Sequence, residues 1–130
     1  MNKKQQEGND TSKLLQSIID GIEEKKGIDI VKIDLTKIDY SESKYFVICQ
    51  GNSTVQANSI AQSVEETVEK ETGETAWHKD GYKNSIWILL DYGDVMVHVF
   101  QKDARAFYNI ENLWADAKIE KIETTIETEN

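Results

Sequence analysis

Two segments of the chain carry apolar residues at every third or fourth position, which is the spacing of a helix with one buried face. In the first, "LLQSIIDGI" (residues 14–22) places leucine and isoleucine on one side, and Gly27 follows as a stop signal. The second begins after Ser53, a favourable N-cap residue, and ends at Gly73. The pattern therefore predicts two amphipathic helices, one near the N-terminus and one in the middle of the chain.

Four other segments have the composition of β-structure. "IDIVKIDLT" (residues 28–36) alternates and is rich in β-branched residues, whereas "YFVICQG" (residues 45–51) is almost continuously apolar, as in a strand buried on both faces. "ETAWH" (residues 74–78) is a short candidate strand. "SIWILLDYGDVMVHVF" (residues 85–100) predicts two strands joined at Gly93, because glycine gives the backbone the freedom that a tight turn needs.

The last part of the chain is predicted to contain one or two short helices, because Asp103 and Asn109 can cap "ARAFY" and "IENLWADA". Residues 118–130 are strongly charged and predict an acidic, disordered C-terminal tail, with a helix lined by Ile119, Ile122 and Ile126 as the alternative. The polar residues 1–10 predict a flexible N-terminal tail. Residues 11–117 then form a single α/β domain in which helices flank a mixed five-stranded sheet.

The composition is that of a globular protein, with 38% hydrophobic and 30% charged residues. No apolar run has the length of a transmembrane helix, and the N-terminal residues lack the apolar segment of a secretory signal, so we expect a cytoplasmic protein without a membrane partner. The net charge of -9 opposes the phosphate contacts on which nucleic-acid binding depends. A basic protein patch is therefore the expected partner, and no dedicated nucleic-acid site is expected.

The sequence does not present a complete catalytic or metal-binding pattern. "GNS" (residues 51–53) lies between a predicted strand and a helix, where backbone N–H groups can meet a phosphate, but it also serves as a helix N-cap. Metal-assisted nucleotidyl transfer typically needs two carboxylates at alternate positions of one strand, whereas Asp91 and Asp94 are three apart across a turn. The alternative hypothesis is an enzyme with an atypical metal site, in which Asp91, Asp94 and Asp34 or Glu111 converge near Ser53.

The histidines and the cysteine do not complete a site either. His78 and His98 form no close-spaced ligand pattern with Cys49, which lies within an apolar run and is predicted to be a buried thiol. His98 alternates with two valines, which indicates a histidine at the edge of the core that bonds to a neighbour, or else a contact residue. We therefore predict no catalytic residues, no cofactor and no metal.

Aromatic residues are concentrated in the second half of the chain, mostly beside charged residues. Each of them can belong to the core, but tryptophan, tyrosine and arginine are also the usual anchors of protein interfaces. A sheet whose helices leave one hairpin uncovered would present such a set together. The residues concerned are Trp77, Tyr82, Trp87, Tyr92, Phe107, Tyr108 and Trp114.

Four segments, taken in order, resemble the Iojap family of ribosomal silencing factors: "DIVKIDLT", "YFVICQGNS", "WILLDYGDVMVHVF" and "RAFYNIENLWADA". The resemblance extends from about Leu14 to Ala117 and is most specific where Trp87, the segment "LDYGD", the segment "VHV" and Arg105 follow one another. The chain departs from the family at Lys44, where an aspartate is usual, and at Asp80, where glutamate is usual.

The resemblance implies a nucleotidyltransferase-like fold without an enzymatic role. It implies that the chain binds the large ribosomal subunit through ribosomal protein fourteen, blocks joining of the small subunit and so represses translation under nutrient limitation. It also implies a homodimer when the protein is free. Joined to the aromatic and acidic pattern above, it leads us to expect Trp87, Arg105 and Tyr108 as anchors on the partner, Asp91 and Asp94 as acidic contacts, and Asp80 and Tyr82 as supporting contacts.

Overall fold

The computed structural model describes residues 3–123, with side chains from residue 10 onward. Its elements are α1 (Lys3–Glu24), β1 (Ile28–Asp34), β2 (Tyr45–Gly51), α2 (Thr54–Thr72), β3 (His78–Asp80), β4 (Trp87–Asp91), β5 (Val95–Gln101), α3 (Lys102–Tyr108), α4 (Ile110–Leu113) and β6 (Lys118–Lys121). None of the described helices has the length and apolar character needed to cross a membrane.

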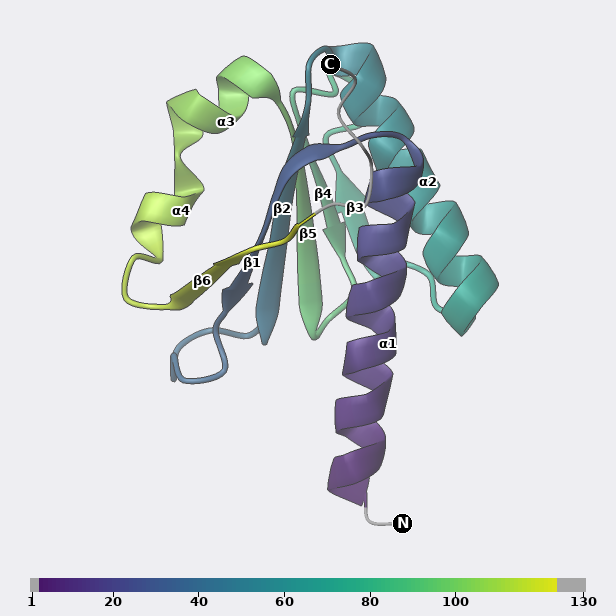
Figure 1. Cartoon of the computed structure of the whole chain (residues 1–130), viewed down its shortest axis with the longest axis vertical. Helices are drawn as coiled ribbons and strands as arrows, with labels where there is room; N and C mark the ends of the chain where they lie inside the picture. Colours follow the sequence, from purple (N-terminus) through teal and green to yellow (C-terminus); the bar gives the residue numbers. More distant parts are fainter. Residues whose placement is uncertain (1–2, 124–130) are drawn as a thin grey trace.

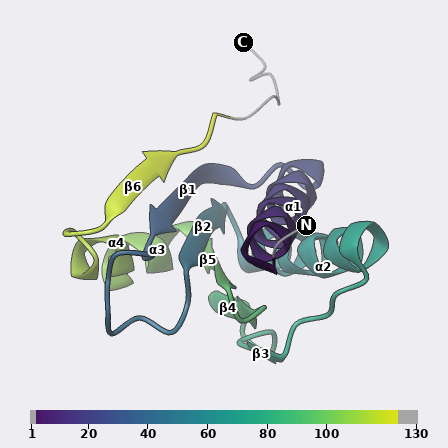
Figure 2. The ribbon, with the colours of Figure 1, turned by 90° about the horizontal axis from the view of Figure 1, so that it is seen from below.

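The strands form one mixed sheet in the order β3-β4-β5-β2-β1-β6. The central strands β2 and β5 run parallel to each other, and the other neighbouring pairs that are described by register run antiparallel. Helices α1 and α2 lie side by side on one face of the sheet, and α3 and α4 lie on the other (Figures 1 and 2). Helix α2, which follows β2, packs on one face of the sheet, and α3, which follows the parallel strand β5, packs on the other.

Side-chain alternation along the central strands gives each face its own apolar layer. The larger layer lies between the sheet and the helices α1 and α2, and it includes Val47, Cys49, Val97 and Val99 from β2 and β5. The smaller layer lies beneath α3 and α4 and includes Ile33, Ile48, Phe100, Ala104 and Ile110. The near-continuous apolar pattern of β2 thus reflects burial on both faces, as predicted for a central strand.

Several local predictions are confirmed by the backbone. The Ser53 hydroxyl accepts a hydrogen bond from the Gln56 N–H at 3.1 Å and caps α2, which ends at Gly73 in the left-handed conformation, with φ 79°. Gly93 has φ 85° in the turn between β4 and β5. Cys49 is fully buried, and burial raises the pKa of its thiol to about 12, so the group is a neutral thiol at ordinary pH.

The sheet has six strands instead of the predicted five, because residues 118–121 form β6 and pair antiparallel with β1. All four side chains of β6 are exposed, so no apolar alternation marks this strand in the sequence. The prediction of a disordered tail from residue 118 is corrected accordingly, and the remainder of that tail, residues 124–130, lies outside the described residues. At the other end, α1 begins at Lys3, within the segment predicted to be a flexible tail.

Candidate functional site: an open face of the sheet

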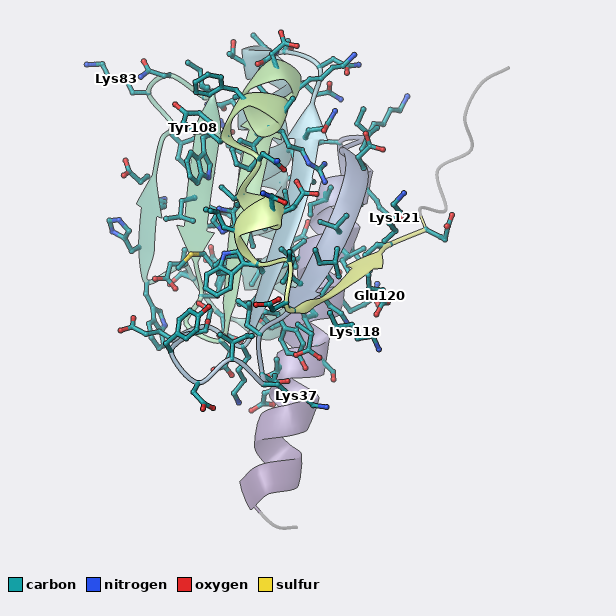
Figure 3. All side chains as sticks on the ribbon, turned by 90° about the vertical axis from the view of Figure 1, so that its left-hand side faces the viewer. Lys37, Lys83, Tyr108, Lys118, Glu120 and Lys121 are labelled. Atoms are coloured by element: carbon teal, nitrogen blue, oxygen red, sulfur yellow. The ribbon has the colours of Figure 1, made fainter. Side chains whose placement is uncertain are left out.

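Strand β4 presents alternate side chains to the two faces of the sheet, and only one of these faces is fully covered. Ile88 and Leu90 are completely buried against the layer of α1 and α2, whereas Trp87, Leu89 and Asp91 are only partly buried on the opposite face. On that side α3 packs on β5 and β2, and β3 and β4 lie beyond it, uncovered (Figure 3). We call the surface formed by Trp87, Leu89, Met96 and Tyr108 the open sheet face.

An aromatic cluster holds Trp87 at one end of the open sheet face. The Trp87 ring stacks on Phe100 with 4.9 Å between centroids and contacts the Tyr108 ring at 5.0 Å. Phe100 is fully buried, while Tyr108 is 48% exposed and its neighbour Phe107 is 80% exposed. The cluster therefore runs from the core to the surface, so its outer rings are available for contact while its inner rings fix their positions.

His98 fixes the orientation of the Trp87 ring through a hydrogen bond. The Trp87 indole Nε1–H donates a hydrogen bond to His98 Nδ1 at 3.1 Å, and the imidazole packs edge-on against Phe46 at 4.7 Å. His98 is 5% exposed, and this burial lowers its pKa to about 4, so the imidazole is neutral at physiological pH and Nδ1 remains an acceptor. This confirms the prediction of a histidine at the edge of the core that bonds to a neighbour.

Two carboxylates lie along the open sheet face. Asp80 of β3 pairs with Leu89 across the antiparallel ladder, and paired residues project to the same side of a sheet, so Asp80 lies on the same face as Leu89 and Asp91. Asp80 is exposed, and Asp91 Oδ1 accepts a hydrogen bond from the Gly93 N–H at 2.8 Å. The structure therefore brings together four of the residues expected to contact a partner: Trp87, Tyr108, Asp80 and Asp91.

Arg105, which the sequence led us to expect as an anchor on the partner, is buried and bonded to other parts of the chain. Arg105 is 9% exposed, and its guanidinium makes a forked pair with the Glu111 carboxylate, with both N–O distances 3.1 Å. Its Nη1 donates to the Asp29 backbone carbonyl at 2.6 Å and to Gln50 Oε1 at 3.1 Å. Arg105 thus joins α3 to α4, β1 and β2, and its contacts lie inside the molecule.

Tyr82 and Asp94 lie on the side of α1 and α2. The Tyr82 hydroxyl bonds to a Glu65 carboxylate oxygen on α2, and burial together with this bond raises the pKa of Tyr82. Asp94 accepts a hydrogen bond from the Thr11 hydroxyl of α1 at 3.0 Å, and Lys44 Nζ lies 3.7 Å from its Oδ2. Neither residue therefore shares the open sheet face with Trp87.

The residues of the alternative enzyme hypothesis are not brought to one point. Glu111 is paired with Arg105, Asp34 accepts from the Thr36 backbone N–H at 2.9 Å, and Asp94 faces α1. A hydrogen bond from the Thr36 side chain, and to a lesser degree one from the Thr36 backbone N–H, lower the pKa of the Asp34 carboxyl. Within residues 10–123, no group of three His, Cys, Asp or Glu side chains is arranged to hold a metal ion.

Leu89 and Met96 were not singled out from the sequence, although they supply the apolar middle of the open sheet face. The signal was present in the alternation of β4 and β5, since Leu89 is two residues from Trp87, and Met96 is two residues from His98. Alternation places each of them on the face of its neighbour, but it does not say which face the helices leave uncovered.

The chain matches the family model described as "Ribosomal silencing factor during starvation" over residues 8–130. The chain belongs to this family. Among curated relatives, the ribosomal silencing factor of Halalkalibacterium halodurans is 39% identical over 113 residues, which are 87% of this chain and 95% of the relative. The factor of Bacillus subtilis is 39% identical over 75% of this chain and 80% of the relative, and the chloroplastic protein Iojap of Zea mays is 32% identical over 78% of this chain and 43% of the relative.

Two solved structures are similar to this chain in both sequence and fold. A crystal structure from Bacillus halodurans has a TM-score of 0.71 and 36% identity, covering 87% of this chain and 99% of the other. A crystal structure from Chromobacterium violaceum has a TM-score of 0.75 and 30% identity, and the match covers 89% of this chain and 92% of the other. The mixed α/β fold is therefore that of these relatives, while the nucleotidyltransferase-like label stays a prediction. The family is named for silencing of ribosomes and carries no enzyme name.

Proposed function

We propose that this protein is a non-enzymatic repressor of translation that acts in the cytoplasm, where it binds the large ribosomal subunit through ribosomal protein fourteen. In this proposal the bound domain occupies space that the small subunit must fill, so joining of the subunits is blocked under nutrient limitation. Membership of the ribosomal silencing factor family supports a ribosomal partner. The observation that supports the proposal is the open sheet face, where the partly buried Trp87 and the half-exposed Tyr108 lie on the same side of the sheet as the carboxylates of Asp80 and Asp91.

The open sheet face has the chemistry of an interface with a basic protein. Trp87 and Tyr108 supply large rings of the kind that anchor interfaces, and Leu89 and Met96 give an apolar surface between them. Asp80 and Asp91 on the same face suit lysine or arginine side chains of the partner. An interface of standard size, about 800 Å² per partner, is enough for useful affinity when the anchors are well placed.

The experiment that tests this proposal is co-sedimentation of the folded protein with isolated large subunits, combined with an assay of subunit joining. Tyr108→Ala is expected to weaken binding by about 1 to 3 kcal/mol, because a half-exposed ring at the edge of the cluster is lost. Trp77→Leu is the matched control, since Trp77 is another exposed ring, 78% accessible, on the side of α1. No binding by the wild-type protein at low salt, or equal losses in the two variants, would refute the proposal.

The acidic part of the interface can be tested separately. Asp80→Asn and Asp91→Asn keep the side-chain oxygens that bond to the turn N–H groups but remove the charges. We expect slower association with large subunits and a weaker dependence of the rate on salt. Asp94→Asn, with the same loss of charge on the side of α1, is expected to leave the association rate within about twofold of wild type, because salt screens a charge that lies away from the contact surface. An Asp94 effect as large as that of Asp80 would place the contact elsewhere.

We further propose that the free protein self-associates as a homodimer. The turn-connected strands β4 and β5 are interior to the sheet, so the edge on this side is the three-residue strand β3. Its unpaired backbone, with the neighbouring open sheet face, offers a surface that a second copy can cover. Sedimentation velocity at high protein concentration tests this, and a purely monomeric profile would rule it out.

A further inference from the structure

His98 of β5 is buried among aromatic rings on the face of the sheet that carries α3 and α4. Its imidazole lies edge-on to the Phe46 ring, with 4.7 Å between centroids, and nearly parallel to the Phe100 ring at 6.4 Å. An apolar side chain would suit these surroundings, because a polar group that is buried without a partner lowers stability. Packing alone therefore does not explain a histidine at this position.

The imidazole makes one hydrogen bond to the described residues, and its partner is Trp87. Because Nδ1 accepts the Trp87 Nε1–H at 3.1 Å, the proton of the neutral ring must lie on Nε2. Nε2 is buried and has no hydrogen-bond partner among the described residues. One nitrogen of His98 is thus left unpaired at a cost to stability, while the other orients a single indole.

The bond to His98 selects which edge of the Trp87 indole faces the protein. Phe100 and Tyr108 contact the indole at 4.9 and 5.0 Å between centroids, but contacts between rings do not select the edge that carries the N–H group. Trp87 is only partly buried, so its N–H can turn toward water when no acceptor is present. Since indole has a single N–H and no acceptor, the bond to His98 leaves only carbon atoms for contact with a partner.

We propose that His98 is a positioning residue for binding of the large ribosomal subunit, which holds the Trp87 indole with its N–H turned into the protein and its carbon atoms at the open sheet face. The inference rests on the proposed function and adds a residue that the partner does not touch. A ring that is already oriented loses less freedom on binding, and this preorganisation raises affinity. The partner group at Trp87 is then an apolar or cationic side chain, because the indole keeps no donor for a carbonyl or carboxylate.

Two substitutions separate the acceptor of His98 from its ring. His98→Phe keeps a flat ring and removes the acceptor, whereas His98→Asn loses the ring and keeps an oxygen at the position of Nδ1. We expect His98→Phe to bind isolated large subunits up to about tenfold more weakly than wild type, since one anchor side chain must be ordered again on binding. His98→Asn is expected to stay within about threefold of wild type, although the lost ring makes it the less stable variant in urea.

Exchange of the indole N–H groups provides a measurement that does not involve ribosomes. The chain has three tryptophans, and NMR of the wild-type protein should show slower exchange with D₂O for the Trp87 N–H than for that of the exposed Trp77. This protection is expected to be lost in His98→Phe and kept in His98→Asn. Trp87→Phe identifies the resonance, and circular dichroism verifies that each variant is folded.

The order of the two His98 variants decides the outcome. Binding by His98→Phe that equals or exceeds binding by His98→Asn, or a wild-type Trp87 N–H that exchanges as fast as that of Trp77, would overturn the inference. His98→Leu, which also lacks an acceptor, replaces His98→Phe if the latter does not fold. If wild type binds large subunits and the variant without an acceptor binds equally well, the inference fails and the proposed function stands. If wild type does not bind, both fail.

Discussion

Replacement of Arg105 by alanine should destabilise the fold rather than remove a surface contact. The change deletes a forked pair with Glu111 and the hydrogen bonds to the Asp29 carbonyl and Gln50 Oε1. Breaking a buried ion pair typically costs about 3 to 5 kcal/mol, because one charge is left without its partner. The Glu111 side chain is 26% exposed and can regain water, so we expect a loss of about 2 to 4 kcal/mol in the free energy of unfolding.

Urea unfolding followed by circular dichroism measures this loss. A double-mutant cycle with Glu111→Gln isolates the pair, and Arg105→Lys, which keeps the charge but not the planar fork, should fall between wild type and Arg105→Ala. Large-subunit binding, measured on the folded fraction, should remain within about threefold of wild type, since a residue outside an interface rarely contributes more. A loss of stability below about 1 kcal/mol, or a large binding defect in a variant of unchanged stability, would show that Arg105 acts at the surface.

Two further predictions concern His98 and Gly93. Burial lowers the pKa of His98 in the folded protein to about 4, from an ordinary value of 6.5. When pH falls, the unfolded chain therefore takes up a proton at this histidine at a higher pH than the folded protein does. Its contribution to stability is complete above about pH 6.5 and is lost as pH falls toward 4, by up to about 3 kcal/mol, and a pH series of urea unfolding should show this slope in wild type but not in His98→Asn. Gly93→Ala should cost about 1 to 2 kcal/mol and shift tryptophan fluorescence, because the added Cβ meets Trp77 at a residue with positive φ. Gly73→Ala, where φ is also positive but no atom lies within 4 Å, should show a similar strain without the fluorescence change; equal fluorescence changes in both variants would contradict the contact.

Elements whose signals are local could be predicted from the sequence. Ser53 and Gly73 mark the ends of α2 because capping depends on residues within one turn, and Gly93 marks the hairpin because its backbone conformation is local. Strand β6 could not be predicted in this way. Its side chains are all exposed, and it forms because its backbone pairs with β1, a partner far away in the sequence.

Only part of the candidate site could be predicted, because some of its contacts come from segments far away in the sequence. Trp87 is partly buried and Tyr108 is 48% exposed, so both rings reach the surface, while their role as anchors stays a prediction. The environment of Arg105 depends on Asp29, Gln50 and Glu111, which come from three other elements, so its burial has no local signature. Asp94 is only three residues from Asp91, yet the hairpin turn between them directs it to α1. The spacing of residues shows which side chains share one face of a strand, but it does not show how side chains on the two sides of a turn are oriented.

The position of β6 has a consequence for the behaviour of the chain in a crowded solution. Without it, β1 would form the rim of the sheet and expose the unpaired backbone of "IVKI", a β-branched segment of the kind that recruits other strands into aggregates. β6 occupies that edge with the charged, exposed sequence "KIEK", and Glu120 Oε1 lies 3.7 Å from Lys32 Nζ of β1. Charged outer strands discourage edge-to-edge growth. We therefore expect removal of β6 to make the protein more prone to aggregate, because the apolar edge of β1 would then be open to other strands.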